Sequence, residues 1–142
     1  KVIKVYGKRY FFLKYKNNID NSFNYVIKNG QFRKNKPIKV RVISKEFNNT
    51  LKKINDVKIK NTLNFLSKYN SFALIIIKDQ KSKQQKISEE FSNKTILRYY
   101  GIGAQIIKDL GIKKMILVSR SKKKVIGLDG YGIKIIKQEI IK

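Results

Sequence analysis

The chain contains neither cysteine nor histidine. Disulfides are therefore excluded, and so is any zinc site built from thiolate or imidazole ligands. A Ser–His or Cys–His nucleophilic pair cannot form either. A metal could be held only by carboxylates, and the 142 residues include nine Asp and Glu. Such a set suits at best a magnesium ion that a substrate helps to hold. We predict that the chain carries no metal and no other cofactor.

Long apolar runs are lacking as well. The longest, residues 72–77, has the length of a strand and falls far short of the ~20 residues that a membrane helix needs. No apolar segment that would make a signal peptide follows Val2 and Ile3. We therefore expect a cytoplasmic protein that does not contact a membrane. The length suits a single domain over residues 1–142, and the first residue, Lys1, suggests a piece of a longer protein.

Acidic residues are scarce: 34 Lys and Arg against nine Asp and Glu give a net charge of +25. This charge invites a nucleic-acid interpretation. However, lysine predominates beside abundant Ile and Asn, as A/T-rich codons would supply, whereas base-specific contacts favour arginine. We interpret the charge as drift at exposed positions and expect nucleic acids to bind only non-specifically. The five arginines are Arg9, Arg33, Arg41, Arg98 and Arg120.

The first half of the chain is typical of strands. Residues 9–16 and 22–28 are aromatic and β-branched and are separated by a polar turn, which predicts two strands of a meander. The alternation of aromatic residues and lysines over residues 9–16 could mimic a face that binds single-stranded nucleic acid, but a half-buried strand has the same pattern. Residues 36–44 predict a third strand, with Pro37 at its start, where a missing amide is tolerated.

The second half alternates helices and strands. We predict a helix over residues 51–69, a buried strand over 72–78 and a helix from Ile96 to Leu110 that ends at Gly111. Strands at residues 115–119 and 133–141 follow, with short helices possible at 87–91 and 123–128. This order predicts an α/β domain in which helices pack on a mixed β-sheet.

One segment has the residues for anion binding. Residues 119–124, Ser-Arg-Ser-Lys-Lys-Lys, follow the end of a predicted strand and open a predicted helix. Free amides at a helix start attract phosphate, and serine and lysine side chains add donors. The glycines of the chain form neither a GxGxxG motif nor a P-loop. From the spacing alone, a solvated turn is the favoured interpretation of this segment.

Three motifs in the C-terminal third carry a resemblance: YGIGAQII at residues 100–107, DLG at 109–111 and GLDGYG at 127–132. They resemble the C-terminal part of GTP cyclohydrolase II, and most closely the form fused behind 3,4-dihydroxy-2-butanone 4-phosphate synthase in riboflavin biosynthesis. Residues 40–44 and 24–30 are similar to two further strands of that family. The resemblance implies a GTP cyclohydrolase II-like fold and a position in the C-terminal part of such a fusion.

The resemblance also implies site residues. Arg98 matches the family's proposed nucleophile, Ser119 replaces a threonine that contacts the nucleotide, and Lys124 matches a lysine with the same role. Ser119 and Lys124, together with Arg120 and Ser121, form the candidate nucleotide- or phosphate-binding set. Members of the family bind a zinc ion through three cysteines. This zinc ion activates the water that opens the guanine ring. Here Glu46 falls near the first ligand position, and Ile96 replaces the proposed general base.

These losses predict a domain that is inactive as a cyclohydrolase. Its expected role is structural or partner-docking, beside an upstream synthase domain and within a homodimer. Three alternatives stay open: a domain that still binds GTP or phosphate, a basic nucleic-acid-binding module, and an active cyclohydrolase with a rewired site.

Overall fold

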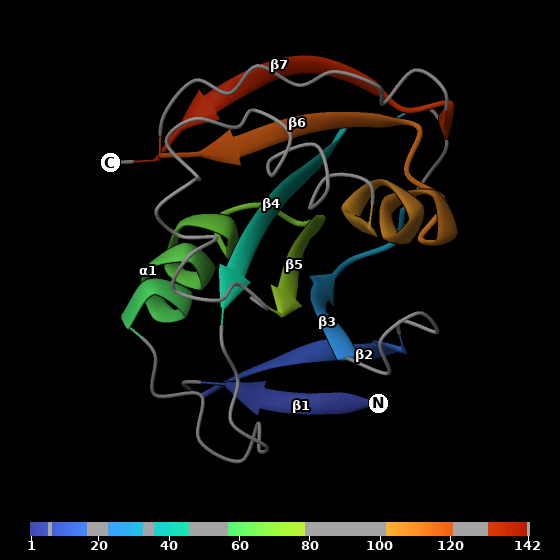
Figure 1. Ribbon diagram of the computed structural model, residues 1–142. Helices are drawn as coiled ribbons and strands as arrows, with labels where there is room; N and C mark the ends of the chain where they lie inside the picture. Colours follow the sequence, from blue (N-terminus) through green and yellow to red (C-terminus); the bar gives the residue numbers. More distant parts are fainter. Residues whose placement is uncertain are drawn as a thin grey trace, which may run out of the picture.

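The computed structural model describes residues 1–5, 7–16, 23–32, 36–45, 57–78, 102–120 and 131–141. Within these ranges, seven strands form one mixed sheet in the order β1-β2-β3-β5-β4-β6-β7. Figure 1 shows the strong twist of this sheet between β4 and β6. The strands are β1 (Val2–Val5), β2 (Lys8–Lys16), β3 (Phe23–Asn29), β4 (Ile38–Lys45), β5 (Phe72–Lys78), β6 (Lys114–Ser119) and β7 (Lys134–Ile140).

The sheet has an antiparallel part and a parallel part. Strands β1, β2 and β3 form a meander, and β3 joins β5 in antiparallel orientation. From β5 onwards, neighbouring strands are all parallel: β5 with β4, β4 with β6, and β6 with β7. Parallel neighbours need crossover connections, so this half of the sheet depends on helices to cover its faces.

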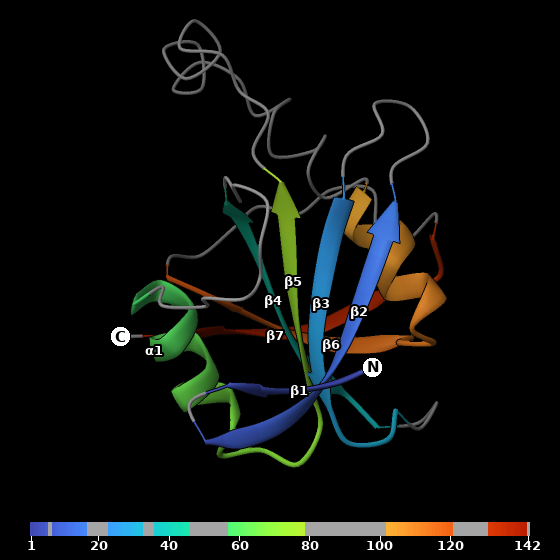
Figure 2. The same ribbon diagram turned by 90° about the horizontal axis from the view of Figure 1, so that it is seen from below.

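Two helices cover opposite faces of the sheet. Helix α1 (Val57–Leu66) lies between β4 and β5 in the sequence, and residues 102–109 form a second helix before β6. Ile59 and Leu63 of α1 belong to one buried cluster, and Ala104 and Ile107 of the second helix belong to the other. Figure 2 shows the two helices on either side of the strands.

Strand β5 is buried on both of its faces. Its alternate residues Ala73, Ile75 and Ile77 face the second helix, while Phe72, Leu74 and Ile76 face α1. All six are at most 1% exposed. Each large apolar side chain buried in this way contributes about 1.5–3 kcal/mol. A continuous apolar run is therefore the expected sequence of a strand that is covered on both faces.

Most predicted elements are confirmed, with shifts at their ends. The strand over residues 72–78 is found as predicted, and the ends of the other five predicted strands are shifted by one or two residues. Strand β1 was not predicted. Gly111 ends the second helix with φ +79°, and its amide donates to the carbonyl of Lys108 at 3.0 Å, as its position after Leu110 predicted.

One helix was predicted too long. Helix α1 ends at Leu66, whereas the sequence predicted helix up to Tyr69. The amide of Tyr69 donates to the carbonyl of Leu66 at 2.9 Å, which tightens the chain into a turn. The predicted start at residues 51–56, the helix turns at 96–101 and the short helices at 87–91 and 123–128 lie outside the described residues. Within the described ranges, no helix is long and apolar enough to cross a membrane.

Candidate functional site

The candidate site lies where the parallel strands end. Because β4, β5, β6 and β7 are parallel, their carboxyl ends lie on the same side of the sheet. The connection from β4 to β5 contains α1, which covers one face of the sheet. Strand β6 lies on the other side of β4, and the connection from β5 to β6 contains the second helix, which covers the opposite face. Such a reversal of direction is a topological switch point, and ligands of open α/β sheets bind in the crevice beside it. Here that position is between the carboxyl ends of β4 and β6.

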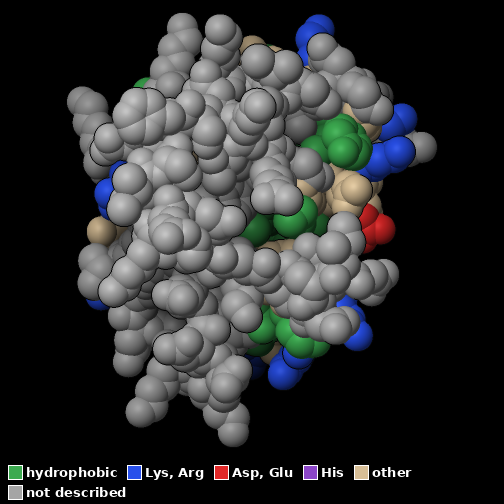
Figure 3. Space-filling view, in the orientation of Figure 1, with side chains coloured by type: hydrophobic (Ala, Val, Ile, Leu, Met, Phe, Trp, Pro, Cys, Tyr) green, Lys and Arg blue, Asp and Glu red, His purple; other side chains and the backbone are tan. Residues whose placement is uncertain are grey.

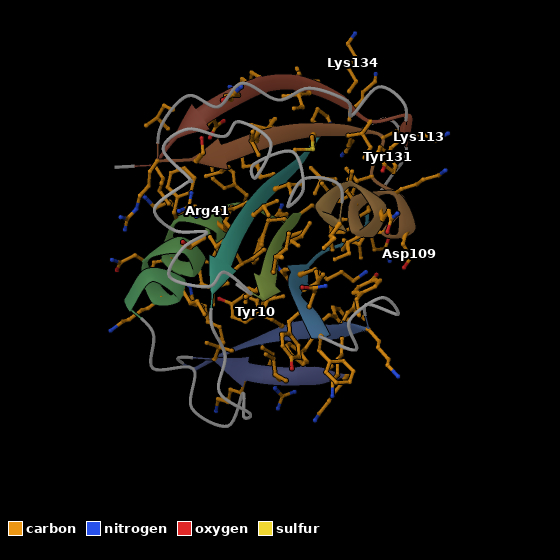
Figure 4. The ribbon with its side chains drawn as sticks, viewed as in Figure 1. Tyr10, Arg41, Asp109, Lys113, Tyr131 and Lys134 are labelled. Atoms are coloured by element: carbon orange, nitrogen blue, oxygen red, sulfur yellow. The ribbon has the colours of Figure 1, made fainter. Side chains whose placement is uncertain are left out.

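The two strands separate at this position. Their ladder ends with the pair Val40–Leu117, although β4 runs on to Lys45 and β6 to Ser119. The side chain of Arg41 lies across the opening, and its Nη1 donates to the carbonyl oxygen of Val118 at 3.4 Å. Arg41 is only 4% exposed, and Figure 4 shows it between α1 and β4. A permanent positive charge is thus buried directly below the switch point.

Two of the predicted site residues lie at this switch point. Ser119 is the last residue of β6 and is 6% exposed, and its carbonyl accepts a hydrogen bond from the amide of Ile141 at 2.8 Å. Arg120 follows it and is exposed to solvent. The other three candidates, Arg98, Ser121 and Lys124, lie outside the described residues. The structure therefore brings Ser119 and Arg120 to the position that the strand-end argument predicted.

Sequence reasoning did not single out Arg41 as part of the site. The signal was present, because a charged residue stands in the middle of the strand Ile38–Lys45, between Val40 and Val42. Charged residues are rarely buried without a polar partner. A buried arginine at the centre of an apolar strand therefore indicates a defined position for its guanidinium group.

A second polar cluster joins β4, β7 and the turn after α1, on the face of the sheet that α1 covers. Lys39 Nζ lies 2.7 Å from Glu139 Oε2, bridging β4 and β7, and 3.4 Å from the centre of the Tyr69 ring. Lys137 Nζ is 3.4 Å from the other carboxylate oxygen of Glu139. The hydrogen bond from Lys39 lowers the pKa of Glu139 below its ordinary value, against the opposing effect of burial. This cluster holds the sheet together across β6.

A third polar contact fixes the second helix to the meander. The hydroxyl of Tyr15 on β2 donates to Asp109 Oδ2 at 2.8 Å. Burial and the neighbouring carboxylate raise the pKa of Tyr15 above its ordinary value, so the phenol stays protonated. Asp109 also lines a surface depression, as do Gln105, Lys108 and Tyr131. Tyr131 packs against the core as well, in agreement with the interpretation of this tyrosine as a core or interface residue.

On the face that Figure 3 shows, the basic side chains of the described residues lie at separate places along the margins and do not form one patch. The aromatic residues of β2 divide between the faces of the sheet: Tyr10 and Phe12 are buried in the core, while Phe11 is 47% exposed. This pattern favours a half-buried strand over a stacking surface for nucleic acid. Among the described residues, no three acidic side chains are placed to hold a metal ion.

Fold and site together define an α/β domain with its candidate site at the carboxyl ends of parallel strands. A sequence model of the GTP cyclohydrolase II family matches residues 3–140. The chain belongs to this family, as its C-terminal motifs predicted.

Individual relatives match over shorter stretches. Riboflavin biosynthesis protein RibBA of Chlorobium phaeovibrioides is 42% identical over 76 residues, which cover 54% of this chain and 17% of the relative. RibBA of Bacillus subtilis is 54% identical over 39 residues, which cover 28% of this chain and 10% of the relative. The matched part is thus less than a fifth of these relatives' length.

A solved structure matches the whole chain. RibBX of A. baumannii, described as a two-domain 3,4-dihydroxy-2-butanone 4-phosphate synthase, aligns with a TM-score of 0.59 at 17% identity. The alignment covers 100% of this chain and 38% of RibBX. At this identity the likeness establishes the fold, and it confirms the predicted α/β class with a mixed sheet.

Proposed function

We propose that the chain is a GTP cyclohydrolase II-like domain of riboflavin biosynthesis that does not catalyse the hydrolysis of GTP. The observation that carries this proposal is the absence of cysteine and histidine from all 142 residues. The family's reaction needs a zinc ion to lower the pKa of the attacking water to about 7. A thiolate-bound zinc has no ligands here, so the chain acts without that cofactor.

The position of the proposed general base supports the same conclusion. Ile96 occupies it and cannot accept a proton. Glu46, near the first metal-ligand position, supplies one carboxylate where the family uses a thiolate. Because metal and base are lost together, no single substitution would restore the reaction.

The role that remains is structural or partner-docking, in the cytoplasm, beside a dihydroxybutanone phosphate synthase domain and within a homodimer. Two observations support it. The apolar strands and the helix faces that cover them form two buried clusters, one on each face of the sheet, so the fold does not depend on the lost groups. RibBX, whose fold covers this whole chain, is described as a two-domain synthase.

Two measurements test the proposal. The purified chain should release no formate from GTP, with or without added Zn²⁺. A synthase domain joined to residues 1–142 should differ from the synthase domain alone in activity or in oligomeric state. Turnover at a rate typical of the family would contradict the first part, and identical behaviour of the two synthase proteins would contradict the second.

Retained binding of a nucleotide or phosphate is a second candidate, favoured by the position of Ser119 and Arg120 at the switch point. The predicted set also includes Arg98, Ser121 and Lys124. Calorimetry with GTP at physiological salt tests this function. Binding that Arg120→Ala weakens would support it, and the absence of any heat of binding would exclude it. General attraction to the positive charge would instead disappear as salt is raised.

A further inference from the structure

The second helix covers only part of its face of the sheet. One row of side chains crosses this face from β1 to β6, and the strand register places in it Val2, Phe11, Lys28, Ala73, Val40 and Leu117. The last three are at most 1% exposed and belong to the buried cluster under the helix. At the other end of the row, Phe11 is 47% exposed and Val2 is 56% exposed. The core of this face therefore ends in an apolar margin that is open to solvent.

The margin begins where the contacts of the second helix with β2 end. Leu13 and Tyr15 pack against the cluster under the helix, whereas Phe11 lies two residues further along the same face of the strand. The ring of Phe32, after β3, also packs against the cluster. The ammonium group of Lys28 lies near both phenyl rings, 6.0 Å from the centre of Phe11 and 4.9 Å from that of Phe32. We call Val2, Phe11, Lys28 and Phe32 the margin patch.

Positive charge surrounds the margin patch. Lys4 and Arg9 face each other in the β1–β2 ladder, on the same side of the sheet as the patch, and both are exposed. Lys28 adds a third cation. Among the described residues, the acidic side chains are Asp109 and Glu139, and both are held in contacts elsewhere. Such a surface fits a partner whose apolar residues are flanked by carboxylates.

The same charges argue against a second copy of this chain as the partner. A symmetric contact would bring the cations of one copy close to those of the other, and like charges in an interface oppose binding. Single-stranded nucleic acid is less suited as well, because it stacks on a series of exposed rings. Here Phe11 is the single aromatic residue among the large exposed hydrophobic residues of the described chain.

The first residue of the chain lies beside the margin patch. The carbonyl of Lys1 accepts a hydrogen bond from the amide of Phe12 at 2.7 Å, which fixes Lys1 to β2 next to Phe11. In the proposed fusion the synthase domain precedes Lys1, so its connection to this domain starts at the patch. A domain linked at this point is present beside the patch at a high effective concentration.

We propose that the margin patch is the docking surface for the upstream synthase domain, which meets it with apolar residues flanked by carboxylates. The contact buries Val2 and Phe11 and thereby continues the core of this face into the interface. Lys4, Arg9 and Lys28 lie opposite the carboxylates. This inference rests on the proposed function and names the surface through which the docking role is exerted.

Cysteine labelling tests the surface directly, because the chain has no cysteine of its own. In a fusion of the synthase domain with residues 1–142, Phe11→Cys should react with a maleimide about tenfold more slowly than in residues 1–142 alone, because the linked domain covers it. Mass spectrometry of the labelled peptide separates this thiol from any cysteine of the synthase domain. Val2→Cys, opposite Phe11 in the ladder, is a second probe that leaves the aromatic ring in place and should be protected equally.

Ile136→Cys is the matched control for these probes. Ile136 is 46% exposed, on the edge strand β7 at the opposite margin of the sheet (Figure 1). Its thiol should react at the same rate in the fusion and in residues 1–142 alone. Equal protection of Ile136→Cys and Phe11→Cys would overturn the assignment of the contact to the margin patch.

A charge reversal tests the complementarity. In the Phe11→Cys background, Arg9→Glu should lower the protection by the synthase domain about threefold, because it sets a carboxylate against carboxylates. Lys108→Glu makes the same change of sign at an exposed residue of the second helix and should leave the protection unchanged. Equal protection with and without Arg9→Glu would overturn the acidic partner surface.

The remaining outcomes separate this proposal from the proposed function. Unprotected thiols at Val2→Cys and Phe11→Cys, in a fusion whose synthase activity or oligomeric state still differs from that of the synthase alone, would overturn the margin patch and leave the proposed function intact. Unprotected thiols with unchanged synthase behaviour would overturn both. In residues 1–142 alone, protection that grows with protein concentration would assign the patch to a second copy. Protection of that chain by single-stranded RNA at physiological salt would assign it to nucleic acid, and either result would overturn the proposal.

Discussion

The central residues of the parallel strands, which we call the strand bodies, differ in polarity from the residues at the carboxyl ends of the same strands. The bodies are apolar and buried: Val40, Ile75 and Leu117 are at most 1% exposed. At the carboxyl ends, the last residues of β4, β5 and β6 are Lys45, Lys78 and Ser119. Under the proposed function, the chain has kept the residues that build the sheet and has lost the residues that the resemblance assigns to catalysis.

If the proposed function holds, fold and activity depend on separate residues. Burial of the strand bodies contributes to stability whatever the ends contain. Catalysis needs a few groups held in position, and it is lost when those groups are lost. Substitutions in the bodies, at the opposite strand ends and at the carboxyl ends should therefore have very different costs.

The largest effect is expected in a strand body. Ile75→Ala should lower the free energy of unfolding by about 3–4 kcal/mol, because the side chain is fully buried between β5 and the second helix and its removal leaves a cavity. Urea denaturation measures this cost. Lys108→Ala, at an exposed position of that helix, is the control and should change stability by less than ~0.5 kcal/mol. A cost below ~1 kcal/mol for Ile75→Ala would contradict the importance of the strand bodies.

The next effect is expected at the opposite end of the strands. Gly30 has φ +81°, and a Cβ placed there would lie 2.2 Å from the carbonyl oxygen of Asn70. Gly30→Ala should destabilise the protein by about 2–3 kcal/mol, since both strain and a backbone clash oppose it. Gly132→Ala is the matched control, with φ +72° and no atom within 4 Å of the new Cβ. Its cost should be only about 1 kcal/mol, and equal costs for the two variants would rule out the clash.

Removal of the ion pair across β6 should lower the free energy of unfolding by less than these substitutions in the core and at Gly30. Glu139→Gln removes the carboxylate that Lys39 holds and should cost about 1–2 kcal/mol at pH 7. Because the pKa of Glu139 is lowered in the folded state, its contribution is complete above the unfolded pKa of about 4.3. The contribution is lost as pH falls through the lower, folded pKa.

Denaturation of wild type and Glu139→Gln between pH 7 and pH 2 measures this dependence. The gap between the two proteins should be constant above pH 5 and should shrink toward zero in acid. A gap that stays the same down to pH 2 would show that Glu139 contributes through packing and not through its charge.

The smallest effect is expected at the carboxyl ends. Arg120→Ala should change the free energy of unfolding by less than ~0.5 kcal/mol, because the residue is exposed at the end of β6. Thermal unfolding measures it. A loss above ~1 kcal/mol would place Arg120 among the residues that build the fold and would blur the distinction between strand bodies and ends.

The sequence predicted the centre of the sheet better than its margins. A continuous apolar run suffices to identify β5, because both of its faces are covered. Strand β1 contains a single apolar pair between two lysines, Val2 and Ile3. It is recognisable only through its pairing with β2, for example Ile3 with Tyr10. Helix α1 ends before Tyr69, whose ring contacts Lys39, a residue far away in the sequence.

The sequence predicted where in the fold the candidate site lies, but not which residues contact one another there. That Ser119 and Arg120 follow a buried strand is a local pattern, and the structure places them at the switch point. The role of Arg41 depends on where β4 and β6 separate, and the Lys39–Glu139 pair joins residues 100 positions apart. Such contacts are decided by strand order and twist, which local patterns do not determine.

The central claim is that this chain has the fold of the GTP cyclohydrolase II family without its catalysis. Formate release from GTP, measured with added Zn²⁺ on a sample that unfolds cooperatively, tests it most directly. The account predicts formate at the level of the enzyme-free control, from a protein that is folded by the same criterion as an active relative assayed alongside. Formate release by the folded chain at the rate of that relative would contradict it.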